Sequence, residues 1–540
     1  MTAVRLALRL GRWGIVGFSL AAFVVTLVNA IGFYLIAGHT PQEHAALGAT
    51  MSALAAQLVV FFPPPLRPDT VAGYVQFRGF NFMAILFAVW ALASATGFAR
   101  GDEEKGLIES ELATGTARIL LVASRVVGFA VAVVIASAAG AVGFVAGAAS
   151  GQESVELSRV LEAVAVLAAL GVACYAISLL VSQLTAARFA TAAAGAVLLA
   201  LFFLNSLSRV FSWLSTWRWL SPFRYYDLSQ PLPPGGTFDT LGFVILIAIA
   251  AAASAAAAIA FWRRDLGGAL VRVPSRPSKP RFEVAAAPWW RYPVVRGLYE
   301  RRLGILAWSA GMAALALVFV SLTRTIVNVL LSIPTLLPYL SIFVHRQLYP
   351  AVLGYTWLNV AQLLFAALAI THVARWSAED VDGRLEMTLS APYSRAAVVL
   401  ERMAALVAVA VVVAAVSGVT LYVASHANGI DLNVPRLLAA SLMLVPFVLV
   451  FAGAGSLLAS INPRAAVGLL GAFAFASYLD TELGTIFKLP LWLQDLSAFK
   501  LYGTPLLTGV NWRNVTLMAL LAIAGLGSSI LLMQRRDVGT

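Results

Sequence analysis

The sequence predicts an all-α polytopic membrane protein with about twelve transmembrane helices, arranged as two homologous six-helix halves with both termini cytoplasmic. Three observations lead to this fold class. Hydrophobic residues make up 61% of the 540 residues and charged residues only 11%, so a water-soluble core could not enclose the apolar surface. The apolar residues gather into runs of about 20 or more, long enough to cross a bilayer as helices. One acidic motif occurs twice, about half a chain length apart.

Twelve apolar runs define the predicted spans. Six precede a polar interruption near the middle of the chain: 14–37, 78–99, 119–148, 161–184, 187–207 and 238–262. Six follow it: 304–326, 351–374, 397–425, 434–460, 464–480 and 513–533. The predicted organisation is therefore a first half over 1–262, a connecting segment over 263–293 and a second half over 294–540.

The orientation of the spans follows from the basic residues. Between 263 and 302 the chain has ten Arg or Lys residues and three acidic ones, and the positive-inside bias places this basic, Pro-rich segment in the cytoplasm. Both termini then lie inside as well. The net charge of +12 is a signal of topology and of contact with lipid headgroups, and we assign it no role in nucleic-acid binding.

The N-terminus has its own pattern. Arg5, Arg9 and Arg12 recur at helical spacing among leucines, which predicts a helix lying on the cytoplasmic interface before the first span. Residues 294–303 form a basic counterpart before the seventh span. Ordinary basic flanks that anchor the following span are the alternative interpretation at both places.

The repeated motif spans 101–118 in the first half and 378–395 in the second, directly after the second span of each. Five positions match at one offset of 277: Gly106 with Gly383, Glu109 with Glu386, Leu112 with Leu389, Arg118 with Arg395, and Arg125 with Arg402. The two segments are thus predicted to be copies, and the chain to be a duplication.

Each copy is acidic, although it is predicted to lie on the cytoplasmic side, where the positive-inside bias favours basic residues. Residues 102–111 contain five acidic residues and one lysine. Leu107, Ile108 and Leu112 recur among them at helical spacing, which predicts a short amphipathic helix suited to docking in a groove of a soluble partner. A solvated loop that only closes the hairpin between two spans is the alternative.

The sequence also bears on the source of energy if this protein moves a compound uphill. It has no Gly-rich phosphate loop ending in Lys-Ser or Lys-Thr, so we expect no ATPase activity in this chain. His372 and Asp480, near span ends, are the closest cases of intramembrane ionisable residues, and they form no relay for a coupling ion. The single cysteine, Cys174, and the five histidines predict neither a catalytic nor a metal site. Energy is therefore expected from outside the membrane domain.

The motif resembles that of the permease subunits of type-2 ABC transporters, specifically the fused twelve-span branch of polyketide antibiotic and drug exporters. That pattern has an acidic pair, a glycine, a further glutamate, and then Leu-Ala/Ser-x-Pro/Gly-x-x-Arg. The two copies here read Glu103-Glu104-Lys-Gly106-x-x-Glu109 and Glu379-Asp380-Val-Asp-Gly383-x-x-Glu386. Pro392 follows the pattern, whereas Gly115 replaces the proline in the first copy.

The resemblance implies a permease that carries a hydrophobic or amphipathic, antibiotic-like or drug-like compound outward across a bacterial cytoplasmic membrane. Two copies of a separate ABC ATPase subunit would bind ATP and Mg and engage the motifs as coupling helices, while this chain holds no cofactor. The residues implied in coupling are Glu103, Glu104, Gly106, Glu109, Leu112, Arg118, Glu379, Asp380, Gly383, Glu386, Leu389 and Arg395.

In the resembled class, the first, second and fifth spans of each half face the central cavity. This nominates six residues of the first half for the substrate path: Asn29, Phe33, Phe87, Trp90, Phe203 and Asn205. Amide and aromatic groups in apolar helices suit a bulky lipophilic ligand, and plain helix packing is the alternative.

Two other classes of function fit a chain with this many spans. An ion-coupled secondary transporter with six-plus-six repeats is the main alternative, and it would need the intramembrane ionisable groups that are lacking here. A polytopic membrane enzyme would show clustered acids on an outer loop, and Asp69 alone does not make such a site.

Overall fold

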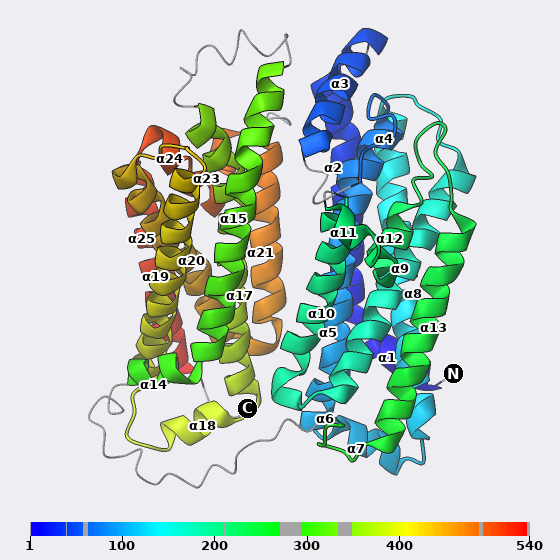
Figure 1. Ribbon diagram of the computed structural model, residues 1–540. Helices are drawn as coiled ribbons and strands as arrows, with labels where there is room; N and C mark the ends of the chain where they lie inside the picture. The colour runs from blue at the N-terminus through cyan, green and yellow to red at the C-terminus, as the bar shows by residue number, and fades with distance from the viewer. Residues whose placement is uncertain are drawn as a thin grey trace. The chain divides into compact units, whose positions relative to one another are not determined.

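The computed structural model describes residues 2–38, 40–57, 63–209, 211–270, 293–332, 348–484 and 490–536. Within these residues all regular structure is helical, and the chain is a polytopic all-α membrane protein, as predicted. Its contacts divide it into two compact units, Met1–Pro277 and Ser278–Thr540 (Figure 1). The division falls inside the predicted connecting segment 263–293, of which 271–292 lie outside the described residues.

The first unit carries α3 at one end and α7 at the other (Figure 1). In chain order its elements are α1 (Thr2–Leu10), α2 (Arg12–Ala37), α3 (Pro41–Gln57), α4 (Val71–Val75), the π-helix η1 (Gln76–Phe80), α5 (Asn81–Thr96), the π-helix η2 (Gly97–Gly101), α6 (Asp102–Glu104), α7 (Leu107–Ala113), α8 (Arg118–Ser150), α9 (Leu157–Leu184), α10 (Ala187–Leu207), α11 (Ser212–Ser215), the 3₁₀-helix η3 (Arg218–Leu220), α12 (Pro222–Asp227) and α13 (Thr240–Arg263).

The second unit has a similar succession of long and short helices. They are α14 (Pro293–Glu300), α15 (Arg302–Ser332), α17 (Leu348–Val381), α18 (Arg384–Leu389), α19 (Arg395–Ala427), α20 (Val434–Ile461), α21 (Pro463–Leu483), α22 (Leu491–Gln494), α23 (Ala498–Tyr502), α24 (Pro505–Thr508) and α25 (Trp512–Arg535).

Eleven helical stretches among the described residues are long and apolar enough to cross a membrane. They correspond to eleven of the twelve predicted spans. The twelfth, 464–480, lies within α21, which is long enough but less apolar, with Arg464 and Asp480 in it. Each of the twelve predicted spans thus coincides with a long helix among the described residues.

The second span of the first unit is longer than the predicted 78–99. It runs from Val71 to Glu104 and contains two π-helical turns, η1 and η2. A π-turn inserts one extra residue and rotates everything that follows it, and such turns occur often at functional sites. The second of them, η2, directly precedes the acidic motif. Its counterpart in the second unit, α17, is a single α-helix from Leu348 to Val381.

Small residues allow the helices of the first unit to pack closely. A Cβ added to Gly143 or Gly147 of α8 would overlap backbone or side-chain atoms of α2. The hydroxyl of Thr26 on α2 donates a hydrogen bond to the carbonyl oxygen of Gly140 at 2.6 Å. Such contacts substitute for the hydrophobic effect, which does not drive helix association in lipid. The pair α2 and α8 is therefore closely joined along its length.

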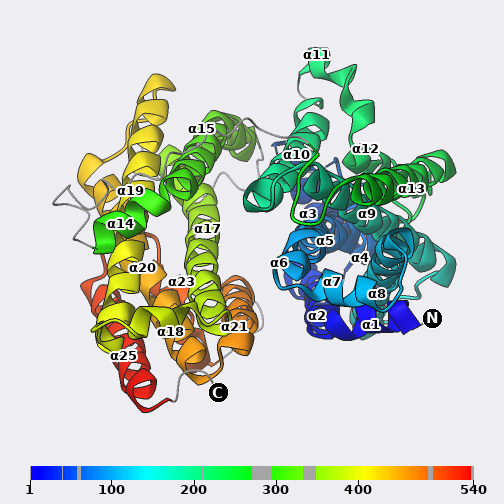
Figure 2. The ribbon, with the colours of Figure 1, turned by 90° about the horizontal axis from the view of Figure 1, so that it is seen from below.

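The basic N-terminal residues form a separate helix, α1, which packs against α8. Ala7 of α1 lies against Gly128 of α8, where a Cβ would come within 2.8 Å of the Ala7 side chain. Figure 2 shows α1 beside α7 and α8 at one end of the first unit. In the second unit α14 packs against α19 in the same way. These two short helices agree with the interpretation of the basic segments as interface helices.

Candidate coupling elements and an adjoining cavity

A glycine in the left-handed conformation begins each acidic helix. Gly106 has φ 69° and precedes α7, and Gly383 has φ 73° and precedes α18. A Cβ added at either glycine would meet no atom within 4 Å. Backbone conformation, and not lack of space, is therefore the reason for glycine here, since L-residues with a side chain are strained at positive φ.

One apolar residue anchors each acidic helix to its own half. Ile108 of α7 is 1% exposed and Leu385 of α18 is 3% exposed, and the two match at the offset of 277. Leu385 packs with Val398, Val399 and Met533. Part of the predicted apolar stripe is thus buried within the half. The outer surface of α7 is acidic and partly apolar, whereas that of α18 carries both Arg384 and Glu386.

Glu103 forms a buried ion cluster with two arginines. Its Oε1 accepts hydrogen bonds from Arg264 Nη1 at 2.7 Å and from the backbone N of Gly267 at 2.6 Å. Its Oε2 accepts from Arg264 Nη2 at 2.7 Å and from Arg100 Nη1 at 3.1 Å. Since all three side chains are at most 4% exposed, the bidentate contact ties the start of the acidic motif to the end of α13 inside a low-dielectric region.

The second half has a simpler version of this cluster. Asp380 matches Glu103 at the offset of 277, and its Oδ2 accepts a hydrogen bond from Arg536 Nη1 at 2.6 Å. Arg536 follows α25 as Arg264 follows α13. The side chains are 12% and 26% exposed, so this pair is more accessible than the cluster of the first half.

Arg118 and Arg395 donate matching hydrogen bonds to backbone carbonyl groups at the C-terminal ends of α13 and α25, the last long helices of the two halves. Arg118 Nη1 donates to the carbonyl oxygens of Phe261, Trp262 and Arg264 at 3.3, 3.4 and 2.9 Å. Arg395 Nη1 donates to those of Met533, Gln534 and Arg536 at 2.7, 3.3 and 2.6 Å. A cation at a helix C-terminus satisfies carbonyl groups that have no partner within the helix. The end of the last long helix is thus fixed to the end of the acidic motif in both halves.

The predicted coupling residues fall into two groups in the structure. Glu103, Arg118, Asp380 and Arg395 make the contacts described above, and Glu379 pairs with Arg402 at 2.9 Å. Glu104, Glu109 and Glu386 are exposed, while Leu112 and Leu389 are half-buried beside them. The first group holds each acidic helix in place, and the second forms its outer surface.

An open hollow lies beside α18. It is lined by Glu386, Leu389, Ser390, Tyr393, Ser394 and Arg395. The hollow thus has the carboxylate of Glu386 and three hydroxyl groups in its lining.

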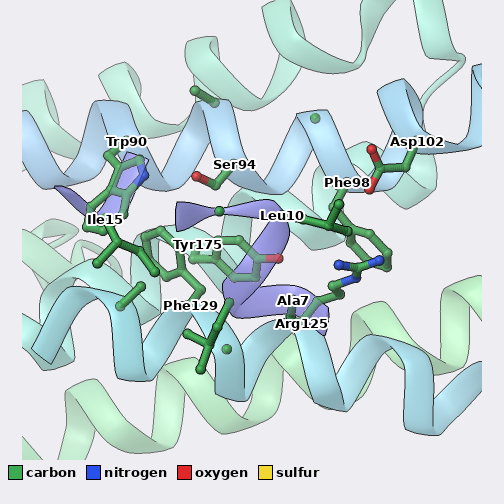
Figure 3. A pocket seen from close by; sticks show the side chains of 16 residues that line it. Ala7, Leu10, Ile15, Trp90, Ser94, Phe98, Asp102, Arg125, Phe129 and Tyr175 are labelled. Atoms are coloured by element: carbon green, nitrogen blue, oxygen red, sulfur yellow. The ribbon is translucent and has the colours of Figure 1, made fainter. Parts of the chain in front are cut away.

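A second cavity, of about 260 Å³, lies within the first half between α1, α5, α8 and α9. In Figure 3, Trp90 and Ile15 lie at one end, Phe129 and Tyr175 in the middle, and Asp102, Phe98 and Arg125 at the other end. The rings of Trp90 and Phe129 are 5.0 Å apart, and those of Phe129 and Tyr175 stack at 4.4 Å. The cavity therefore has an aromatic wall and a charged end.

The six residues predicted for the substrate path occupy different environments. Phe33 and Phe87 are fully buried, and Asn29 Nδ2 donates to the carbonyl oxygen of Val25 in its own helix at 2.8 Å. Phe203 is half-buried and packs edge-on against Phe202. Trp90 lines the cavity of Figure 3. The structure thus brings Trp90 to a cavity and buries Phe33 and Phe87 within the first half.

Asn205 belongs to a polar cluster near the end of α10. Its Nδ2 donates to Asp227 Oδ2 at 2.6 Å, and Asp227 also pairs with Arg209. Burial raises the pKa of the Asp227 carboxyl above its ordinary value, while the bonds to Arg209 and Asn205 oppose this effect. The amide of Asn205 is therefore engaged in joining α10 to α12.

Sequence reasoning did not identify Arg264, Arg536 and Asp102 as site residues. Arg264 and Arg536 stand in the Arg-Arg-Asp segments with which both halves end, and this repetition was the available signal. Asp102 stands beside the acidic pair, where its type and position do not distinguish it from Glu103. Its separate environment becomes evident only when α1, α5 and α8 are placed together.

The chain matches one protein-family model over residues 1–262 and 297–532. The description of this model is "Multidrug efflux system permease Rv1217c, C-terminal domain". The match includes both acidic motifs and, apart from the last one to three residues of α13 and α25, all eleven candidate membrane-spanning stretches. A comparison with curated proteins gives no match.

Proposed function

The chain belongs to the family of the multidrug efflux permease Rv1217c and is a multi-pass efflux permease, and we propose that it is the membrane-spanning part of an ATP-driven ABC exporter. In this proposal two copies of a separate ABC ATPase subunit bind ATP and Mg and dock on α7 and α18. The exported compound is hydrophobic or amphipathic and drug-like. The chain supplies the path across the membrane, and its partner supplies the energy.

The proposal includes the topology given by the basic residues. Both termini, α7 and α18 lie in the cytoplasm, and the protein resides in the cytoplasmic membrane of a bacterium. The basic interface helix α1 and the acidic helix α7 lie at the same end of the first half, which agrees with this assignment (Figure 2). The ATPase would then approach from the side where ATP is available.

The observation that carries the proposal is the pair of short motif helices, α7 and α18, each with an exposed glutamate and each fixed to the end of the last span of its half. Matching contacts recur in the two halves, with Arg118 and Arg395 on helix-end carbonyl groups. These recurrences support the duplication inferred from the sequence. They also support two docking sites of similar construction, one for each ATPase copy.

The two groups of motif residues would have different roles in coupling. The exposed Glu104, Glu109 and Glu386 would face basic residues of the ATPase, where complementary charge favours association and correct orientation. The buried Glu103 and its arginines would transmit movement, because they join α6 to the end of α13. A displacement of α7 by the ATPase would therefore move these elements of the half together.

We expect the purified chain to hydrolyse no ATP by itself and to bind two copies of its cognate ATPase in detergent. Two acidic helices provide two docking sites, and the sequence has no phosphate-binding loop. Native mass spectrometry of the co-purified complex gives the number of ATPase copies. A stable complex with a single copy, or ATP hydrolysis by the chain alone, would contradict the proposal.

Replacing Gly106 or Gly383 by Val should reduce ATPase stimulation while the chain remains folded. Both glycines have positive φ, which costs an L-residue roughly 1–2 kcal/mol, and a β-branched residue tolerates it least. Asn is the matched control, because it tolerates this conformation and a side chain meets no atom within 4 Å here. Stimulated ATPase activity should follow the order Gly, Asn, Val. Equal activity of the three proteins would mean that the glycine turns do not contribute to coupling.

A further inference from the structure

The carboxylate of Asp102 lines the cavity of Figure 3 without an ionic partner of its own. Within the described residues it makes no hydrogen bond and no ion pair, although it is half-buried. Burying a charge in an apolar protein interior is costly unless it is paired. An unpaired carboxylate at the end of an aromatic cavity is therefore a feature that calls for a ligand.

The corresponding carboxylate of the second half is fully paired. Glu379 matches Asp102 at the offset of 277, and it contacts Arg402 at 2.9 Å and Arg375 at 3.4 Å. The same offset relates Arg375 to Phe98 and Arg402 to Arg125. One of the two arginines is thus replaced by an aromatic residue in the first half.

The remaining arginine of the first half forms its ion pair with an acidic residue other than Asp102. Arg125 pairs with Glu111, whose counterpart in the second half is the uncharged Thr388. The guanidinium of Arg125 also lies 5.1 Å from the centre of the Phe98 ring. Arg125 therefore forms its ion pair with Glu111, and no ion pair joins it to Asp102 in the described part of the chain.

Two charged residues, Asp102 and Arg125, line the charged end of the cavity. Because Arg125 is paired with Glu111, the carboxylate of Asp102 is the charge at this end that a ligand can pair with. The aromatic wall formed by Trp90, Phe129 and Tyr175 extends away from this end along α5 (Figure 3). Trp90 and Asp102 are twelve residues apart on this continuous helix, which corresponds to about 18 Å. A ligand that matches both ends has a cationic head and an apolar or aromatic body.

We propose that this cavity binds amphipathic cations, with the ammonium group at Asp102 and the aromatic body between Trp90, Phe129 and Tyr175. The aromatic wall stacks on the aromatic body of the ligand, and the apolar lining removes that body from water. Arg125 Nε is buried without a hydrogen-bond partner in the described part of the chain, so it can donate to an acceptor atom next to the ammonium group. The binding itself does not depend on ATP, whereas the assignment of such cations to the exported compounds rests on the proposed function.

Three ligands with the same aromatic body test the charge preference. The full chain is reconstituted in phosphatidylcholine nanodiscs, and binding of 1-pyrenebutylamine, 1-pyrenebutanol and 1-pyrenebutyric acid is followed by energy transfer from tryptophan, with empty nanodiscs subtracted. We expect the cationic amine to bind roughly tenfold more tightly than the neutral alcohol, equal to about 1.4 kcal/mol. The acid should bind most weakly. Equal affinity of amine and alcohol, or tightest binding of the acid, would overturn the proposal without the use of any variant.

Two variants locate the preference at Asp102. Asp102→Asn should abolish the difference between amine and alcohol and leave the affinity for the alcohol unchanged. Glu111→Gln should lower the affinity for the amine, because Arg125 is released to pair with Asp102 as Arg402 pairs with Glu379. Glu104→Gln is the matched control, since Glu104 is exposed and does not line the cavity. A preference for the amine that persists in a folded Asp102→Asn protein would overturn the site.

This experiment separates the cavity from the proposed function. It uses the chain without an ATPase or ATP, so a failure of amine binding leaves the stoichiometry of the ATPase complex unaffected. A complex without two ATPase copies would in turn leave the binding data intact. The two proposals can therefore fail independently.

Discussion

Replacing Glu103 by Gln should destabilise the chain more than any other single change in the acidic motifs. The carboxylate accepts four hydrogen bonds, and its removal leaves the charges of Arg100 and Arg264 buried without a counterion. Removing one partner of a buried ion pair costs roughly 3–5 kcal/mol. Unfolding of the purified chain by titration with SDS, followed by tryptophan fluorescence, measures the loss.

Three further variants test the cause of this loss. Glu104→Gln removes an exposed neighbouring charge and should change the stability by no more than about 0.5 kcal/mol. Asp380→Asn should have an intermediate effect, because its pair with Arg536 is more exposed. The double variant Glu103→Gln with Arg264→Met should recover part of the loss, because it removes one uncompensated cation. If Glu103→Gln is as stable as Glu104→Gln, the cluster is not a structural clamp.

Reversing the charge of both Glu109 and Glu386 to Lys should prevent stable binding of the ATPase. A like-charge contact at an interface costs several kcal/mol, whereas one exposed charge elsewhere is worth no more than ~1 kcal/mol. Each single reversal should affect one of the two docking sites, so native mass spectrometry should detect complexes with a single ATPase copy. The double reversal should leave the permease without ATPase and abolish substrate-stimulated ATP hydrolysis.

The control for charge alone is Asp431→Lys. Asp431 is exposed and follows α19, at the opposite end of this helix from Arg395. Its reversal should leave ATPase binding unchanged. Insertion into the membrane should be normal for the reversed glutamates, because added positive charge on a cytoplasmic loop agrees with the positive-inside bias. Unchanged ATPase binding by the double variant would place the energy-coupling surface elsewhere.

The fold class could be predicted because it depends on the quantity that sequence shows most directly, the length and hydropathy of each run. The predicted helix also forms at α21, although Arg464 and Asp480 lower its hydropathy below that of the other spans. The extension of the second span to Val71–Glu104 was missed. Its two π-turns depend on tertiary contacts and have no simple sequence period.

The candidate site was accessible to sequence reasoning only where a pattern repeats. Offsets between the halves identified Gly106, Glu109 and Arg118 together with their counterparts. They could not reveal that Glu103 binds Arg264, a residue 161 positions away. The unpaired state of Asp102 depends on a difference between the halves, the replacement of Arg375 by Phe98, and a search for similarity passes over such differences.

The first three turns of α8 have a thermodynamic consequence. Arg118 binds the end of α13, Arg125 lines the cavity, and Gly128 contacts α1. These three residues lie within about 15 Å along one closely packed helix. Occupancy of the cavity and occupancy of the docking surface then act on the same rigid body. Linkage requires such an influence to be reciprocal: whatever factor a bound cation applies to the affinity for the ATPase, the ATPase applies to the affinity for the cation. A compound could therefore regulate the assembly of its own exporter before any ATP is hydrolysed.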